Sequence, residues 1–174
     1  MGNIEGRIGG TFMGFSLSAE IDSSRNIFGR LGGKLSGNDI NLTLSPDGEK
    51  LTGRIGGNVI GNDLKADIKE DESSSYNVTG RLGGDTIGND IKLEGKNEIT
   101  GRVGGKRVGF DVNLSISQEL SPGKESITGR LGGKIIGVNV NLTLDDFPPI
   151  VGAILSTVTY QTLKDYQHAS TSSN

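Results

Sequence analysis

The chain contains no cysteine and no tryptophan, one histidine and four prolines among 174 residues. Without cysteine, neither a disulfide nor a thiolate metal site can form. The lone histidine, His168, lies in the polar C-terminal stretch HASTSSN. Because Cys/His and Ser/His/Asp sites need a well-placed histidine, we expect no enzymatic activity, no catalytic residues, no metal site and no cofactor.

Long apolar runs and a strong excess of one charge are also missing. No segment approaches the roughly 20 consecutive apolar residues of a membrane span. The formal net charge is −3, from 18 basic and 21 acidic residues. A nucleic-acid-binding domain would carry a basic face, so we expect no nucleic-acid partner.

The first residues, MGNIEGRIGG, lack the basic start and apolar stretch of a signal peptide. We therefore expect the chain to be cytoplasmic or exported by a non-classical route.

Glycine, by contrast, is abundant, with 29 residues in the chain. Many of these glycines belong to one motif, Gly-Arg-hydrophobe-Gly-Gly, which occurs six times. Its arginines are Arg7, Arg30, Arg54, Arg81, Arg102 and Arg130. Successive arginines are 21 to 28 residues apart, a period that indicates a repeat architecture.

Each copy predicts a β-hairpin, as the third copy, LTGRIGGNVIGNDLKADI at residues 51–68, illustrates. A two-residue type II′ turn needs glycine at its first central position, which places the turn at Gly57 and Asn58. This turn pairs Ile55 with Ile60 and collects the hydrophobic residues on one face. A shift of the turn by one residue would scatter them over both faces. The same rule puts four further apolar residues on the inner faces of other copies: Met13, Ile87, Val108 and Ile136.

The segment after residue 144 breaks this pattern. It begins DDFPP and continues with residues that are apolar nearly all round, which is typical of a helix surrounded by protein. A β-branched run, STVTY, leaves a thirteenth strand as the alternative. A closed barrel of about twelve strands would be roughly 24 Å across. A helix about 10–12 Å wide would fit inside it with one layer of side chains between.

We therefore predict a mainly β fold, with six hairpins giving about twelve antiparallel strands in meander order. The strands form a barrel or a strongly curved sheet around a hydrophobic C-terminal helix. Residues 1–144 would form the sheet, 145–167 the helix of the same domain, and 168–174 a disordered tail.

The arginines are one candidate binding site, because guanidinium groups bind anions. Four of them are followed nine residues later by an aspartate, which favours a cross-strand ion pair in each hairpin. Arg7 and Arg130 have Ser16 and Asn139 at this position instead. They are therefore the arginines that we expect to be freest to bind an anionic ligand.

Three asparagines, Asn38, Asn62 and Asn89, are a second candidate site. Their place in the alternation points them inward, where buried amides need hydrogen-bond partners. The partners that we expect are Thr157, Thr159 and Gln161 of the helix; a small polar pocket for a ligand is the functional alternative.

Calcium is a weaker candidate. Stretches such as GGDTIGND are similar to the glycine-rich nonapeptide calcium repeats, but two extra residues separate GG from GND and the copies are not in tandem.

These observations favour a non-catalytic structural or interaction protein, a hairpin-repeat scaffold that acts as a subunit of a homo-oligomer or protein assembly. The alternative is a ligand-binding β-barrel for an anionic or amphipathic small molecule or a lipid. A membrane-active, toxin-like protein that uses the apolar helix is the weaker alternative.

Overall fold

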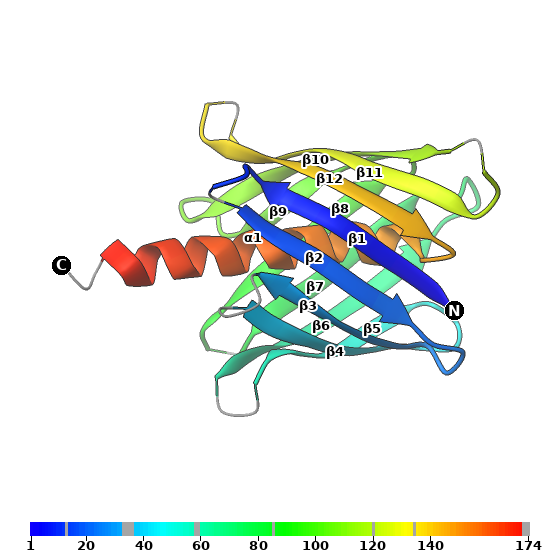
Figure 1. The fold of residues 1–174 in the computed structure, drawn as a ribbon, viewed down its shortest axis with the longest axis horizontal. Helices are drawn as coiled ribbons and strands as arrows, with labels where there is room; N and C mark the ends of the chain where they lie inside the picture. Colours follow the sequence, from blue (N-terminus) through cyan, green and yellow to red (C-terminus); the bar gives the residue numbers. More distant parts are fainter. Residues whose placement is uncertain are drawn as a thin grey trace.

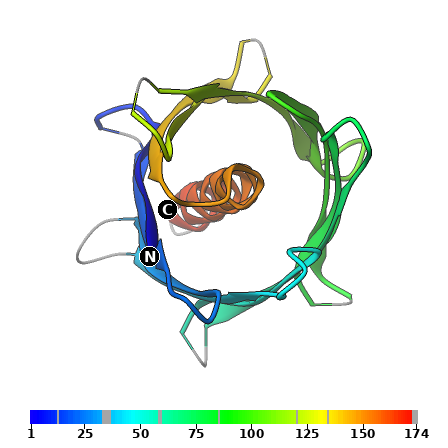
Figure 2. The same ribbon diagram turned by 90° about the vertical axis from the view of Figure 1, so that its right-hand side faces the viewer.

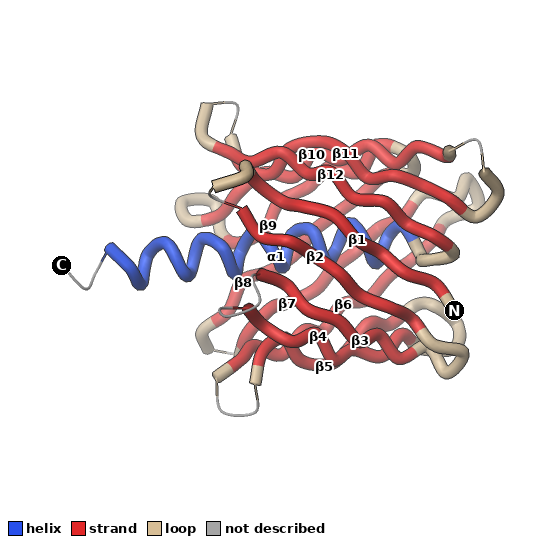
Figure 3. The backbone as a smooth tube through the Cα atoms, in the orientation of Figure 1, coloured by secondary structure: helices blue, strands red, loops and turns tan. Residues whose placement is uncertain are grey.

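The computed structural model describes residues 1–12, 14–32, 37–57, 60–84, 86–119, 121–133 and 135–171, of which residues 170 and 171 are described without their side chains. It contains twelve β-strands and one helix (Figures 1 and 3). The strands are β1 (Gly2–Gly9), β2 (Gly14–Ile21), β3 (Asn26–Gly32), β4 (Gly37–Leu44), β5 (Lys50–Gly56), β6 (Gly61–Glu70), β7 (Tyr76–Gly83), β8 (Gly88–Gly95), β9 (Glu98–Gly104), β10 (Gly109–Gln118), β11 (Lys124–Gly132) and β12 (Gly137–Asp145). The helix is α1 (Pro149–Thr171).

The strands form a closed antiparallel barrel. Each strand pairs with its neighbours in sequence, and β1 pairs with β12 to close the ring (Figure 2). Closure leaves no unpaired sheet edge, so the predicted twelve-strand meander is confirmed in its barrel form. The odd-numbered strands run toward one end of the barrel, which we call the rim and which carries the six hairpin loops. The even-numbered strands run toward the opposite end, which we call the base.

Alternation of side chains gives the barrel an apolar interior and a polar exterior. In β6, Leu64, Ala66 and Ile68 are buried, whereas the intervening Lys65 and Asp67 are exposed. Residues 150–163 of α1 are also buried, so the strands and the helix share one core.

Each odd-numbered strand also has a glycine at an inward position of the alternation, opposite a buried residue of a neighbouring strand: Gly6, Gly29, Gly53, Gly80, Gly101 and Gly129. At Gly53 a Cβ atom would lie 2.2 Å from the carbonyl oxygen of Asn41 and 2.7 Å from the Cα atom of Leu42. The glycine that precedes each arginine therefore lets adjacent strands and their leucines approach closely.

Helix α1 enters the barrel at the base and runs through it to the rim (Figure 1). Its buried hydroxyl groups bond to carbonyl oxygens of the helix itself: Ser156 Oγ donates to Gly152 O at 2.9 Å and Thr159 Oγ1 to Leu155 O at 2.8 Å. Such bonds allow serine and threonine inside a buried helix. The segment is therefore a helix, and the thirteenth strand that we considered as the alternative does not form.

The helix is not centred in the barrel. It contacts the wall formed by β10, β11, β12, β1, β2 and β3 most closely (Figure 2). Gly152 permits this approach, because a Cβ atom there would lie 2.8 Å from Ile127 Cδ1 and 3.0 Å from Ile4 Cδ1.

The helix boundaries differ from the prediction. The helix begins at Pro149, because β12 continues to Asp145 and the positive φ of Asp146, 50°, turns the chain into the barrel. It extends to Thr171, so residues 168–171, which we predicted as disordered, are helical. Residues 172–174 lie outside the described part of the chain.

The hairpin register also differs from the prediction, by two residues. Gly56 pairs with Gly61, Ile55 with Asn62 and Arg54 with Asp63, so the loop has four residues rather than two. A shift of two keeps every strand residue on its predicted face, which is why alternation alone could not detect it. The predicted inner positions of four apolar residues are wrong, because these residues lie in the loops and are 77% to 86% exposed: Ile60, Ile87, Val108 and Ile136. Met13 falls outside the described residues.

Candidate functional site

A pair of facing glycines frames each rim loop. In the third hairpin these are Gly56, with a φ of 100°, and Gly61. A Cβ atom on Gly56 would lie 2.9 Å from the Cα atom of Gly61, and one on Gly61 would lie 2.7 Å from the carbonyl oxygen of Ile55. The two backbones meet too closely for any other residue, so the glycines set where each loop begins and ends.

The motif arginine holds the loop in place. Arg54 donates from Nε to the carbonyl oxygen of Gly57 at 3.0 Å, and from Nη2 to that of Gly61 at 3.4 Å. It therefore connects the first residue of the loop with the glycine that closes it. Four other arginines donate from Nε in the same way to the glycine three residues later: Arg7, Arg81, Arg102 and Arg130.

The predicted ion pairs are present in the four hairpins that have the aspartate. Their members lie directly opposite each other across the hairpin: Arg30 and Asp39, Arg54 and Asp63, Arg81 and Asp90, Arg102 and Asp111. The aspartate side chains are more than half exposed, so each pair adds little stability.

Arg7 and Arg130, the candidate anion-binding residues, have hydrogen-bond partners. Arg7 Nη1 donates to Ser16 Oγ at 3.2 Å, and Nη2 donates to three loop carbonyl oxygens at 2.8 to 3.3 Å. Arg130 Nη1 donates to Asn139 Oδ1 at 3.1 Å. Serine and asparagine thus replace the aspartate as acceptors, and the reason for regarding these two arginines as free does not hold.

The three candidate asparagines lie at the rim ends of their strands. Asn62 is exposed, and Asn38 and Asn89 are half-buried. A Cβ atom on Gly56 of β5 would lie 3.6 Å from Asn38 Oδ1, which places this amide beside the neighbouring hairpin. The asparagines therefore line the opening of the barrel rather than its interior.

The helix residues that we expected to pair with these asparagines bond within the helix. Thr157 Oγ1 donates to Ile154 O at 2.7 Å, and Thr159 Oγ1 to Leu155 O. Gln161 Nε2 donates to Asp165 Oδ1 at 2.8 Å. The prediction that the two threonine hydroxyls serve the asparagines is wrong, because carbonyl oxygens of the preceding helical turn are closer at hand.

The rim carries most of the exposed apolar side chains of the described residues. The loops contribute Phe12, Ile60, Ile87, Val108, Ile135 and Ile136, all at least 77% exposed. Tyr166, on the part of α1 that projects from the rim, is 43% exposed. Only two other large apolar residues in the described chain are exposed, Met1 and Phe28, and both lie in the half of the barrel nearer the base.

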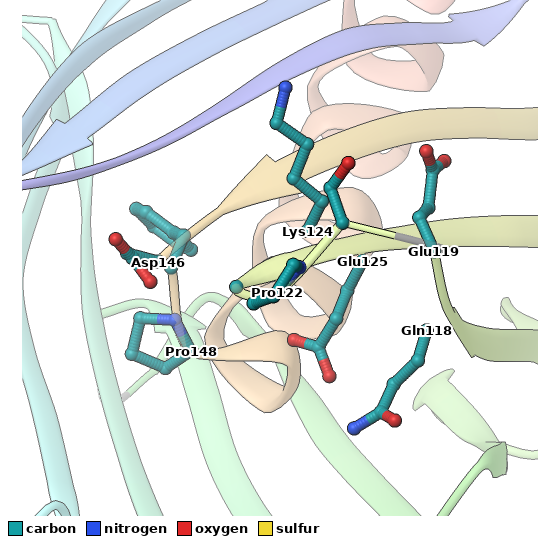
Figure 4. Close-up of a pocket in the computed structure, with 10 residues that line it drawn as sticks. Gln118, Glu119, Pro122, Lys124, Glu125, Asp146 and Pro148 are labelled. Atoms are coloured by element: carbon teal, nitrogen blue, oxygen red, sulfur yellow. The ribbon is translucent and has the colours of Figure 1, made fainter.

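Two hollows open at the base beside the start of α1. One, of about 470 Å³, is lined by Gln118, Glu125, Asp146 and Pro148, among others (Figure 4). Burial raises the pKa of the Glu125 carboxyl. Its charged form is thus less stable in this hollow than in water.

The second hollow, of about 370 Å³, is lined by residues that include Glu49, Glu70 and Tyr76. Burial is the main cause that raises the pKa of the Tyr76 hydroxyl, and the nearby charges of Glu70 and Glu125 raise it further. Both hollows are therefore acidic in character.

Loop carboxylates add to the acidity of the base. Three exposed aspartates accept hydrogen bonds that lower their pKa values. The main donor is the backbone of Asn26 for Asp22, the side chain of Ser45 for Asp47 and the side chain of Ser73 for Asp71. These bonds hold the loops and keep the carboxylates charged at neutral pH. The described residues contain no group of three His, Asp or Glu side chains that could hold a metal ion.

Sequence reasoning missed the exposed loop residues and the role of the arginine. A signal for both was present, because each copy has a glycine five residues after the first glycine of its Gly-Gly pair. Facing glycines five residues apart frame a four-residue loop, which moves the last apolar residue of the loop outside the barrel.

In the described part of the chain, no helix is long and apolar enough to span a membrane.

Comparisons with protein-family models, with curated proteins and with solved structures found no match to this chain.

Proposed function

We propose that this chain is a non-catalytic interaction protein, a hairpin-repeat barrel that presents its rim to a partner as a subunit of a larger assembly. One observation carries the proposal: the exposed apolar side chains of the described residues concentrate in the loops of one end. Exposed apolar groups that gather in one region mark interaction surfaces more often than scattered single residues do.

The construction of the loops supports this proposal. The arginine bonds and the facing glycines fix the backbone of each loop. The apolar residue that precedes the closing glycine is exposed and does not contribute to the core. A loop that served only as a connection could carry a polar residue there at no cost in stability. An apolar residue at the same place in several loops is explained by contact with a partner.

The alternative of a barrel that binds a ligand inside has less support. The inward side chains of the strands and residues 150–163 of α1 are buried against one another. The hollows of the described structure open at the ends and on the outer surface instead. A ligand of about drug size would need an enclosed apolar space.

Light scattering and native mass spectrometry test the proposal on the native chain and on a rim variant with Ile60→Ser, Ile87→Ser, Val108→Ser and Ile136→Ser. We expect the native chain to associate as its concentration rises, and the variant to remain monomeric while it folds normally. Equal masses for both chains, together with a co-purified small molecule, would instead favour the ligand-binding alternative.

A further inference from the structure

We propose that the partner of the rim is the base of a second copy of this chain, so that the barrels associate head to tail. This inference rests on the proposed function, because it names the partner of the same rim. Three independent observations support it: the places of the exposed apolar residues, the distribution of charge, and the projection of α1.

The exposed apolar residues of the described barrel concentrate at the rim, where six loop residues and Tyr166 form one group, and Met1 lies at the base. Phe28 is exposed on the outer wall, directly opposite Asn41. The rest of the outer face presents polar residues such as Glu5, Asn41 and Asp67. Association side by side would bury these polar residues, whereas association end to end buries the apolar ones.

The charges of the two ends are complementary. In the described parts of the rim loops the charged residues are Lys106 and Arg107, and both are exposed; the projecting end of α1 adds Lys164 and Asp165, whose charges offset each other. The base loops carry mainly carboxylates: Asp22, Asp47, Glu49, Asp71, Glu72, Glu119 and Asp146, against Arg25 and Lys96. A basic end attracts an acidic one and repels another basic end, so charge favours rim-to-base contact over rim-to-rim contact.

The projection of α1 restricts the partner further. The C-terminal part of the helix extends past the rim along the barrel axis (Figure 1), and residues 165–169 are exposed. Two rims could not meet face to face because both helix ends would collide. A flat lipid surface would touch the polar helix end before the loops. The base of another copy carries the buried start of α1 instead of a projecting end, with hollows of about 470 and 370 Å³ beside Pro148.

A rim-to-base contact is heterologous, because two different surfaces meet. Such contacts form rings if the rotation between copies closes, and open filaments if it does not. Each copy keeps one unused end, so mass should increase stepwise with concentration and should not stop at a dimer.

Two variants that each disable one end test this directly. The rim variant described above removes the apolar loop residues. A base variant, Glu49→Lys with Glu119→Lys, reverses two exposed charges, one beside each hollow. A matched control, Glu5→Lys with Asp67→Lys, makes the same charge change on the outer wall of the barrel, at two exposed side chains that line neither hollow.

Mass photometry or sedimentation should find each end variant monomeric by itself. An equimolar mixture should form a heterodimer of twice the 18.2 kDa chain mass and nothing larger, since each partner supplies its one intact end. The control should associate as the native chain does. Association of the native chain should weaken as sodium chloride screens the contact, since the Debye length falls from about 14 Å at 0.05 M to about 4 Å at 0.5 M.

Other results would overturn the proposal in distinguishable ways. If the base variant associates like the native chain while the rim variant does not, the rim binds something other than the base, and only the head-to-tail inference fails. The same holds if the native chain stays monomeric but sediments with anionic phospholipid vesicles through its rim. If the native chain and the rim variant behave alike in every assay, the proposed function fails as well.

Discussion

At the scale of single residues, the repeated motif determines where each rim loop begins and holds the loop in place. Its first glycine brings two strands together inside the barrel, its arginine bonds to the loop carbonyl oxygens, and its last two glycines begin the loop. Each role depends on hydrogen bonds or on the absence of a side chain, so each can be tested by a single substitution.

The inner glycine should tolerate no side chain. Gly53→Ala places a Cβ atom 2.2 Å from the carbonyl oxygen of Asn41, at a φ of 147°. Overpacking and backbone strain together should lower the free energy of unfolding by about 3 kcal/mol or more. Gly57→Ala is the control, because its Cβ atom would make only an ordinary contact, 3.6 Å from the carbonyl oxygen of Ile60, and the change should stay within about 0.5 kcal/mol. Urea denaturation compares them, and equal losses for both variants would contradict this account.

The arginine should matter more for its bonds to the loop than for its ion pair. Arg54→Met removes bonds to Gly57, Gly61 and Asp63, and should cost about 1–3 kcal/mol. Asp63→Asn removes the charge of a partner that is 57% exposed and should cost less than about 1 kcal/mol. Measuring the unfolding of both variants at low and at high salt separates the contribution of the ion pair from that of the loop bonds. A larger loss of stability for Asp63→Asn would mean that the ion pair contributes more than the bonds to the loop.

One carboxyl group at the base should be destabilising when it is charged. The raised pKa of Glu125 means that the folded state binds its proton more tightly than the unfolded state does. Stability from this group is therefore present below its unfolded pKa and is lost as pH rises through the folded pKa. Glu125→Gln should be more stable than the native chain at pH 7 and no more stable at pH 3. A thermal melt at both pH values checks this, and a Gln variant that is less stable at pH 7 would show that the carboxylate has a favourable partner.

At the scale of elements, helix α1 replaces the second layer that an antiparallel sheet needs. Its apolar side chains are buried by the strands: Ile150, Val151, Ile154, Leu155, Val158 and Leu163. Each such burial contributes about 1.5–3 kcal/mol. Together these contributions are comparable with the whole stability of a typical domain, about 5–15 kcal/mol.

Two truncations distinguish the buried part of the helix from the projecting part. Removal of residues 148–174 should abolish cooperative unfolding, because the barrel interior would be open to water. Removal of residues 165–174 takes away the exposed turns and the edge-to-face contact of Tyr166 with Phe15, and should cost about 0.5–2 kcal/mol. Circular dichroism during heating measures both. A chain without residues 148–174 that still melts cooperatively would show that the strands do not need the helix.

Alternating hydrophobicity was enough to predict the strands and their faces, because burial depends on faces, and the apolar segment that breaks the alternation predicted the helix. It could not set the register, since pairing Ile55 with Asn62 instead of Ile60 leaves every strand residue on the same face. The position of Ile60 outside the barrel follows from backbone contact between Gly56 and Gly61, which a face pattern does not record. The bonds of Arg7 and Arg130 depend likewise on where the loop carbonyl oxygens point.

At the scale of the whole molecule, the chain is a barrel with two different ends. Closure removes the sheet edges through which β-proteins associate most readily, so assembly cannot proceed by pairing of strand edges. The rim is apolar with basic residues, and the base is acidic and hollowed. This polarity is the physical basis of the proposed assembly.

The rim is the proposed surface through which the chain associates. Because the chain has no cysteine, a single nitroxide spin label can be placed at Ile60→Cys on the rim or at Asn41→Cys on the outer middle of β4. Electron paramagnetic resonance over a concentration series then reports the mobility of each label. We predict that the rim label becomes immobilised as the mass of the particles increases, while the label at position 41 stays mobile. A rim label that remains mobile while the mass increases, or a label at position 41 that is immobilised instead, would contradict the account.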